Sequence, residues 1–392
     1  MTTAWGTPVA VPAWSEEDLA AIRRLRALGS SVAEQFVGRR AALDLLEVAV
    51  IAREHVLLLG PPGTGKTDLI TRFAAGFGTA PFVRLITRFT EPAEVFGPVD
   101  VKSFREGRYE VRTEGMLPTA RIAFLDEIFQ SGSPILNTLL TVLNERVFHN
   151  GRAVQPVPLI TLVGAANSLP QDPALLAFAD RFLLRLQVAP VAGDHLEELL
   201  GKHLARSGGP AAALPGEAHE WVSTDALERL NRQMSRVGLS RVGPYYTGLV
   251  RELLDQGVTL SDRRITHGLR LVAAAALRAE RTTAEPRDLW PLRHFWADPA
   301  QAAIVREAVQ RRVEADGGES GPPDRTAHQI VTDAQVTGRQ VGPGAAPAAV
   351  ENTLRALNRL RLELRRADPG NQRDLAIITT IINNTLALLQ QG

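Results

Sequence analysis

The stretch HVLLLGPPGTGKT, residues 55–67, decides the fold. Its first half is a short continuous apolar run, which is typical of a buried strand in a parallel sheet. Its second half matches the pattern glycine-x4-glycine-lysine-threonine, and the segment KTDLITRFAAGF that begins at its lysine has helical periodicity. A strand, a glycine-rich loop and a helix in this order predict a loop that cradles the phosphates of ATP or GTP.

Each residue type in this loop has a chemical reason to be there. Gly60, Gly63 and Gly65 let the backbone wrap closely round the phosphates, with successive N–H groups pointing inward. We expect Lys66 to reach the β- and γ-phosphates and the Thr67 hydroxyl to bind Mg²⁺. The predicted nucleotide contacts of this segment are Gly60, Pro61, Pro62, Gly63, Thr64, Gly65, Lys66, Thr67 and Asp68.

Three further apolar runs indicate more buried strands. They are FVRLI at 82–86, RIAFLDE at 121–127 and LITLVGAAN at 159–167, and helical patterns separate them. Strands that alternate with helices predict an α/β fold with a parallel sheet covered by helices on both faces. After about residue 190 only helical patterns remain.

Polar side chains stand at the ends of two of these runs. Asp126 ends an apolar strand pattern, and we expect it to hold Mg²⁺ through the metal's shell. Glu127 follows it as the candidate base that polarises the attacking water. Asn167 ends the next run and is a candidate for orienting that water or contacting the γ-phosphate. Taken alone, each of these residues also fits an ordinary strand end or turn.

Composition narrows the class of protein. A chain of 392 residues is long enough for two or three domains, and its net charge of +1 gives no electrostatic case for nucleic-acid binding. The absence of cysteine excludes disulfide scaffolds, thiol catalysis and cysteine-based metal sites. No signal peptide or membrane segment is visible, so the expected location is cytoplasmic.

A phosphate loop, an Asp-Glu strand end, an Asn strand end and a helical remainder together resemble the AAA+ ATPases. TRFTEPAEVFGP at 87–98 and EGRYEVRTEGMLP at 106–118 are similar to the insert of the MoxR branch. FLDEIFQSGSPILNTLLTVLNER, GAANSLP, ADRFLLRL and LSDRR extend the resemblance over about residues 30–300, and they are most similar to the RavA subgroup. Beyond residue 300 the resemblance weakens.

The resemblance implies roles for two arginines and a ring. Arg181 stands where the family places the arginine finger that reaches a neighbouring subunit's γ-phosphate, with Arg185 as the alternative. Arg263 matches the lid arginine that closes over the phosphates, with Arg264 as the alternative. A finger that acts between subunits implies a homo-hexamer, with ATP or ADP and Mg²⁺ as cofactors.

The resemblance also implies an adenine contact and partners. Val37 and Gly38, in QFVGRR, are similar to the segment that borders adenine. The insert at 88–118 and a hairpin at 147–158 would project from the ring and contact a client protein that the sequence does not identify. The family implies a partner with a von Willebrand factor A domain.

The expected domain order follows from these patterns. Residues 1–190 would form the nucleotide-binding core with a helical N-terminal segment, and residues 191–298 an all-helical lid. A helix at 299–315, a linker or extended arm at 316–350 and a helical hairpin at 351–392 would complete the chain. The hairpin has leucines and isoleucines at helical spacing on two segments.

Three functions fit these residues. The first is an ATPase that remodels or assembles a client protein, as the family resemblance implies. The second is a ring-shaped nucleic-acid translocase, which the single arginine and single histidine of the hairpin VFHNGRAVQPVP disfavour. The third is a nucleotide-gated scaffold, whose function would survive Glu127→Gln.

Overall fold

The computed structural model describes residues 13–191, 195–207, 221–315, 327–339, 341–342, 347–367 and 371–390. Two compact units are present. The larger one holds the described residues within 1–35, 42–190 and 210–320, and the smaller one holds those within 36–41, 191–209 and 321–392. Among the described residues, no helix combines the length and the apolar character that crossing a membrane requires.

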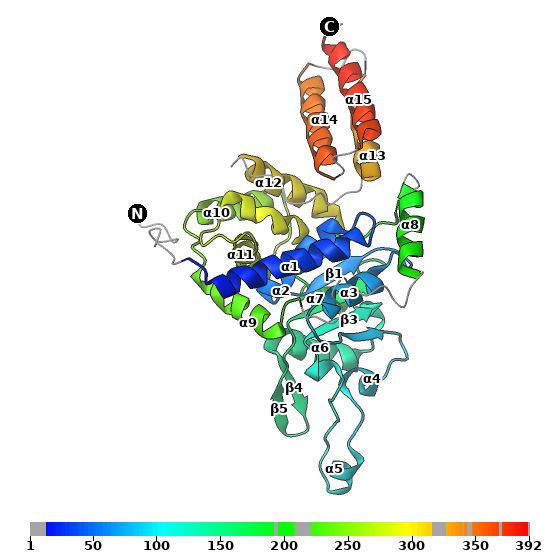
Figure 1. The fold of residues 1–392 in the computed structure, drawn as a ribbon, viewed down its shortest axis with the longest axis vertical. Helices are drawn as coiled ribbons and strands as arrows, with labels where there is room; N and C mark the ends of the chain where they lie inside the picture. Colours follow the sequence, from blue (N-terminus) through cyan, green and yellow to red (C-terminus); the bar gives the residue numbers. More distant parts are fainter. Residues whose placement is uncertain are drawn as a thin grey trace. The chain divides into compact units, whose positions relative to one another are not determined.

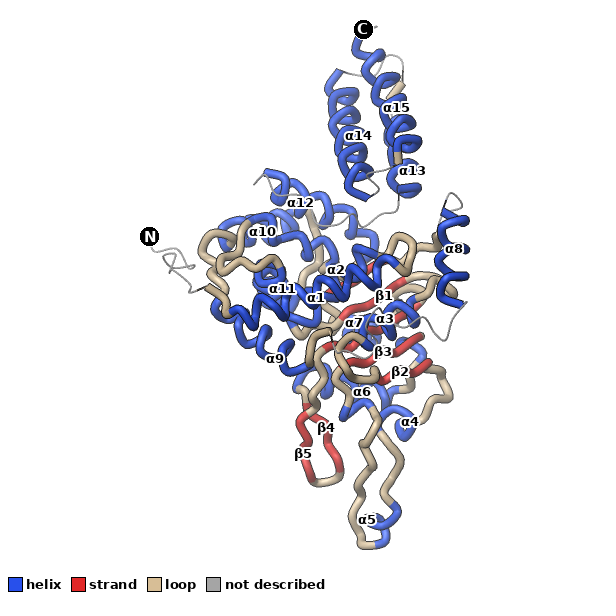
Figure 2. Tube along the Cα trace, in the orientation of Figure 1, coloured by secondary structure: helices blue, strands red, loops and turns tan. Residues whose placement is uncertain are grey.

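A five-stranded parallel sheet forms the centre of the larger unit (Figures 1 and 2). Its strand order is β2-β3-β6-β1-β7, which places the first strand between the last two. The bounds are β1 Val56–Leu59, β2 Phe82–Leu85, β3 Ile122–Asp126, β6 Thr161–Ala166 and β7 Leu184–Gln187. All residues of β1 and β6 are buried, as the continuous apolar runs predict. The predicted α/β fold is therefore confirmed.

Helices surround this sheet in the larger unit. Their bounds are α1 Glu16–Glu34, α2 Arg40–Ala52, α3 Lys66–Ala75, α6 Ser133–Glu145, α7 Pro173–Ala179, α9 Thr224–Gln233, α10 Gly243–Asp255, α11 Asp262–Arg278 and α12 Ala302–Ala315. Helix α11 is buried on all sides over residues 271–277, since every residue from Leu271 to Leu277 is buried. A 3₁₀ segment, Pro286–His294, packs against both α11 and α12. The described part of the expected lid is helical, apart from one isolated bridge between Gly238 and Thr283.

The insert and the hairpin both project from the larger unit (Figure 1). The insert carries α4, Pro92–Phe96, and α5, Val101–Arg105, which lies at its tip. The hairpin pairs β4, Val147–Asn150, with β5, Ala153–Pro156, in antiparallel register. Gly151 in its turn has a φ of 61°, which suits glycine.

The smaller unit contains α8, Leu196–Ser207, and three C-terminal helices: α13, Ala327–Gly338; α14, Pro347–Ala367; and α15, Gln372–Gln390. The extended arm expected over 316–350 is wrong for residues 327–338, which form α13. Ile330, Val331 and Ala334 on α13 are buried against leucines and isoleucines of α14 and α15. The two-helix arrangement expected at the C-terminus is therefore a three-helix cluster, since a hairpin alone would leave these apolar faces uncovered.

Candidate functional site

Three polar strand ends meet at the carboxyl edge of the sheet. β3, β6 and β1 are adjacent and parallel, so the residues that follow them lie along one edge. Those residues are the pair Asp126 and Glu127, then Asn167, then the loop at 60–65. The carboxyl edge of an open parallel sheet is where α/β proteins bind their ligands.

The phosphate loop begins with a glycine that no other residue can replace without a shift. The Gly60 N–H donates to the Ala166 carbonyl oxygen at 3.0 Å, which ties the loop to β6. A Cβ atom on Gly60 would lie 2.1 Å from the Val188 carbonyl oxygen. Gly63 and Gly65 have φ values of 78° and 76°, the left-handed conformation that glycine adopts most easily.

Lys66 opens helix α3 and is buried at the centre of the loop. Its ammonium donates to the carbonyl oxygens of Gly60 and Pro61, at 2.8 and 2.9 Å. Thr67, the next residue, is exposed at the same helix end. Asp68 instead forms an ion pair of 2.8 Å with Arg72 one turn further along α3. The lysine and threonine thus stand at the helix N-terminus, where phosphate oxygens are favoured.

Asp126 and Glu127 form a tight turn at the end of β3. The Asp126 Oδ1 accepts the Glu127 N–H at 3.0 Å. Glu127 has φ 51° and ψ 41°, a left-handed conformation that is uncommon for a residue with a side chain and often marks a functional site. Both side chains are half-buried, and Asn167 at the neighbouring strand end is exposed.

The oxygen donors at this edge suit Mg²⁺. The Thr67 hydroxyl and the Asp126 carboxylate are hard ligands of the kind that Mg²⁺ takes in small number, with waters and substrate phosphates completing its shell. No cluster of three or more histidines, aspartates and glutamates that could hold a metal occurs among the described residues. The chain thus fits a metal that arrives with a nucleotide better than a metal held by protein ligands alone.

The candidate finger lies at the opposite, amino edge of the sheet. Arg181 precedes β7, which runs parallel to β1, so it stands where the strands begin while the phosphate loop stands where they end. Its Nε is buried without a hydrogen-bond partner, and its side chain donates no hydrogen bond within the described residues. Arg185, the alternative, is buried and donates to the Ala179 carbonyl oxygen at 2.8 Å and to the Ala297 carbonyl oxygen.

The two candidate lid arginines differ in the same way. Arg264 is 1% exposed and bonds to Asp180 and to the carbonyl oxygens of Leu183 and Phe295. Arg263 is half-buried, its Nη1 is buried without a partner, and no described residue accepts a hydrogen bond from its side chain. Burial lowers the pKa of Arg263, and the nearby charge of Arg181 lowers that pKa further. Because Asp180 pairs with Arg264 at 3.1 Å, their sequence neighbours Arg181 and Arg263 lie near each other at the amino edge.

Val37 and Gly38, the predicted adenine contacts, belong to the smaller unit. Gly38 has a φ of 64° between α1 and α2, which explains the glycine in QFVGRR. The adenine role of both residues stays a prediction.

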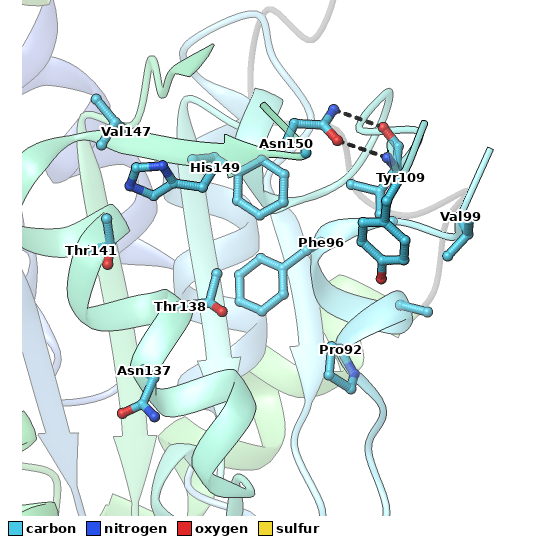
Figure 3. A pocket seen from close by; sticks show the side chains of 15 residues that line it. Pro92, Phe96, Val99, Tyr109, Asn137, Thr138, Thr141, Val147, His149 and Asn150 are labelled. Carbon is cyan, nitrogen blue, oxygen red and sulfur yellow. Dashed lines mark hydrogen bonds between the residues drawn. The ribbon is translucent and has the colours of Figure 1, made fainter. Parts of the chain in front are cut away.

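A cavity of about 380 Å³ lies between the insert, the hairpin and α6 (Figure 3). The rings of Phe96 and Phe148 stack in it with centroids 5.7 Å apart. Asn150 fastens the hairpin to the insert, since its Oδ1 accepts the Val111 N–H at 2.7 Å and its Nδ2 donates to the Val111 carbonyl oxygen at 3.0 Å. The lining carries no Asp, Glu, Lys or Arg side chain.

The insert exposes apolar side chains while several of its charges pair with one another. Phe104 is 62% exposed and Tyr109 is 61% exposed. Asp100 pairs with Arg112 at 2.9 Å, and Arg108 with Glu106 at 2.6 Å. Exposed apolar groups of this kind are typical of surfaces that contact other proteins.

Comparison with known proteins decides the family. The model of the MoxR domain in the MoxR-vWA-beta-propeller ternary systems matches residues 23–232, and that of an AAA lid domain matches residues 246–309. The chain belongs to the MoxR family of AAA+ ATPases. An uncharacterized protein of Methanocaldococcus jannaschii is 35% identical over 74% of this chain and 74% of its own length.

Two further proteins are similar to this MoxR protein. Chaperone MoxR1 of Mycobacterium tuberculosis is 28% identical over 56% of this chain and 57% of its own length. The crystal structure of a candidate ATPase from Cytophaga hutchinsonii has a TM-score of 0.61 and 17% identity, over 76% of this chain and 96% of that one, which shows a shared fold. The narrower assignment to a RavA-like subgroup stays a prediction.

Sequence reasoning missed the polar groups that hold the amino edge together. Glu54 is 3% exposed, and its Oε1 lies 3.1 Å from Arg270 Nε in an ion pair and 3.0 Å from His267 Nδ1. Asp180, beside Arg181, pairs with Arg264. These pairs join residues that are 84–216 positions apart in the sequence, and none of the residues belongs to a motif that would mark it. The sequence therefore carries no signal for them.

Proposed function

We propose that this MoxR protein hydrolyses ATP to ADP and phosphate in a homo-hexameric ring and uses the cycle to remodel or assemble a client protein. The observation that carries the proposal is the separation of the two charged sites. The phosphate loop stands at the carboxyl edge of the sheet, and Arg181 stands at the amino edge. A four-residue strand spans about 13 Å, so Arg181 faces the nucleotide of another subunit rather than its own.

At the carboxyl edge, the loop N–H groups and Lys66 bind the β- and γ-phosphates. Thr67 and Asp126 would hold Mg²⁺, which neutralises charge on the phosphate oxygens when bound. Glu127 takes a proton from the attacking water, and Asn167 orients that water. The left-handed backbone of Glu127 supports this role, because strained backbone at a strand end is a feature of active sites.

At the amino edge, Arg181 and Arg263 stabilise the charge that develops on a neighbour's γ-phosphate. Neither Arg181 nor Arg263 donates a side-chain hydrogen bond to a described residue. Both Nη groups of Arg185 donate to backbone oxygens, although its Nε is also buried without a partner, and Arg264 bonds to Asp180 and to backbone oxygens. This difference in occupied donors supports Arg181 and Arg263. The family resemblance implies a lid arginine that closes over the phosphates. The Asp180–Arg264 pair places Arg263 near Arg181, which favours the phosphates of the neighbouring subunit for both.

The insert and the hairpin are the proposed output of the cycle. Both project from the larger unit, and Asn150 joins them so that one cannot shift without the other. The matching model is named for systems that pair a MoxR domain with a vWA protein and a β-propeller protein. We therefore infer a partner with a von Willebrand factor A domain, and a cytoplasmic location for the complex.

The test compares two variants of the full chain. Glu127→Gln keeps the phosphate loop and blocks hydrolysis, so it should bind ATP and hold a von Willebrand factor A partner of the same organism in a stable complex. Lys66→Ala should bind neither nucleotide nor partner in an ATP-dependent way. If the partner co-sedimented equally with both variants, this result would contradict the proposal and favour the nucleotide-gated scaffold. Salt-dependent DNA binding would favour the translocase.

A further inference from the structure

Four arginines, Arg181, Arg185, Arg263 and Arg264, lie about Asp180 at the amino edge. Burial lowers the pKa values of Arg185, Arg263 and Arg264, and the charge of Asp180 opposes that lowering in each of them. Only Arg264 contacts it through hydrogen bonds: its Nε and Nη2 donate to Asp180 Oδ1 at 3.2 and 3.1 Å. Glu54 and Asp298 are further nearby negative charges, acting on Arg263 and Arg185, and Asp180 is the carboxylate that bonds directly to Arg264.

The Asp180–Arg264 pair is held on every side. Ser261, the N-cap of α11, donates from Oγ to Asp180 Oδ2 at 2.9 Å. Arg264 Nη1 donates to the carbonyl oxygens of Leu183 and Phe295 at 2.7 and 2.6 Å, and Nη2 donates to that of Phe182 at 3.1 Å. A guanidinium with this many partners has one rotamer and one position.

Each member of this pair is the sequence neighbour of a candidate catalytic arginine. Asp180 precedes Arg181, and Arg264 follows Arg263. The paired residues have their donors and acceptors occupied, whereas the two neighbours have buried N–H groups without partners. Like charges repel, so Arg181 and Arg263 would move apart unless the backbone on both sides were fixed.

We propose that Asp180 and Arg264 are positioning residues that hold Arg181 and Arg263 together as one preformed site for a phosphate of the neighbouring subunit's nucleotide. This inference rests on the proposed function. The pair would thus do more than join two parts of the fold. Because it fixes the guanidiniums of Arg181 and Arg263 before the nucleotide arrives, no conformational entropy has to be lost to order them in the catalytic step. It also makes the finger and the lid arginine a single unit, because Asp180 ends α7 while Arg264 belongs to α11.

The chain offers a matched control at the other end of the same helix. Arg278, in the last turn of α11, pairs with Asp44 and with Glu47, whose Oε2 lies 2.6 Å from its Nε. Asp44 is 2% exposed and joins α11 to α2. Asp44→Asn therefore removes a charge from a buried aspartate–arginine pair of α11, as Asp180→Asn does, without touching the backbone beside Arg181.

The experiment measures ATP turnover, nucleotide affinity and melting temperature for Asp180→Asn, Asp44→Asn, Arg181→Ala and the double variant Asp180→Asn/Arg181→Ala. Asparagine keeps the shape of aspartate: its Oδ1 can still accept from Arg264, and its Nδ2 can donate to the Ser261 hydroxyl. We expect Asp180→Asn to lower kcat at least tenfold with KM unchanged within a factor of two, and Asp44→Asn to leave kcat within twofold. The double variant should be no slower than Arg181→Ala alone.

Three results would overturn the inference: an unchanged kcat for Asp180→Asn, an equal loss for Asp44→Asn, or additive losses in the double variant. A failure of the proposed function has a different signature, since the unsubstituted protein would then not turn over ATP or Glu127→Gln would turn it over normally. In that case the inference can still be tested by the ATP-dependent association of subunits, measured by sedimentation with Lys66→Ala as the reference. Asp180→Asn should weaken that association, and an unchanged association would overturn the inference.

Discussion

The two edges of the sheet offer opposite kinds of proposed phosphate site. At the carboxyl edge, the proposed phosphate-binding groups are the backbone N–H groups of one short glycine-rich segment and the ammonium of Lys66. At the amino edge, they are guanidiniums from the turn after α7, from β7 and from α11, which lie far apart in the sequence. The first kind of site is encoded locally, whereas the second depends on which arginines tertiary structure leaves without partners.

The strongest test of this difference replaces each of two arginines, four residues apart, with alanine. Arg181→Ala should lower kcat by about a thousandfold, the lower end of what an arginine finger contributes, with the melting temperature nearly unchanged. Arg185→Ala should instead destabilise the fold by about 2–4 kcal/mol, because it leaves buried carbonyl oxygens unpaired and opens a cavity. Steady-state turnover and thermal unfolding of both variants give the comparison, and a reversed pattern would show Arg185 to be the finger.

At the carboxyl edge, Glu127→Gln should lower kcat by about a hundredfold or more, since it removes a general base. Nucleotide affinity should stay within a few-fold, because the phosphate loop and Asp126 are untouched. Glu252→Gln serves as the control: Glu252 lies on α10 and pairs with Arg312 of α12 at 2.6 Å, outside the predicted site, so its loss should change turnover less than twofold. Equal losses in the two variants would remove Glu127 from the catalytic role.

How much the sequence predicts differs between these edges. The strand, loop and helix around residues 56–75 could be predicted from the sequence because they follow one another directly, and the roles of Asp126 and Glu127 stay predictions. The choice between Arg181 and Arg185 could not, because it depends on the carbonyl oxygens of Ala179 and Ala297. Helix α13 was missed for a related reason: its polar, glycine-flanked segment is stabilised by contacts with α14 and α15.

Glycine substitutions probe the local site in a second way. Gly60→Ala would place a Cβ 2.1 Å from the Val188 carbonyl oxygen, whereas a Cβ on Gly63 would meet no atom within 4 Å. Both residues have positive φ, so both alanine variants have backbone strain. The clash with a neighbouring atom occurs at Gly60 alone of these two. Thermal unfolding should show a larger loss for Gly60→Ala, by about 1–3 kcal/mol. Equal losses would mean that strain alone sets the cost.

The smallest predicted effect links the amino edge to pH. His55 is buried just before β1; its Nδ1 accepts the Leu162 N–H at 3.1 Å, and its Nε2 lies 3.4 Å from the Leu143 carbonyl oxygen. Burial, with the charge of Arg146 second, holds the pKa of His55 well below its usual value. Near pH 6.5 the unfolded chain therefore takes up a proton at His55, and the folded chain does not. The stabilisation that the neutral His55 provides is fully present above that pH.

As the pH falls below about 6.5, the free energy of unfolding should decrease by up to about 1.4 kcal/mol per pH unit from this residue, until the folded-state pKa is reached. His55→Asn keeps an acceptor for Leu162 and has no proton to gain, so its stability should depend less on pH. Thermal or urea unfolding between pH 5 and 8 measures the difference between the two curves. Parallel curves would contradict the prediction and would place the acid sensitivity elsewhere among the charged groups of the amino edge.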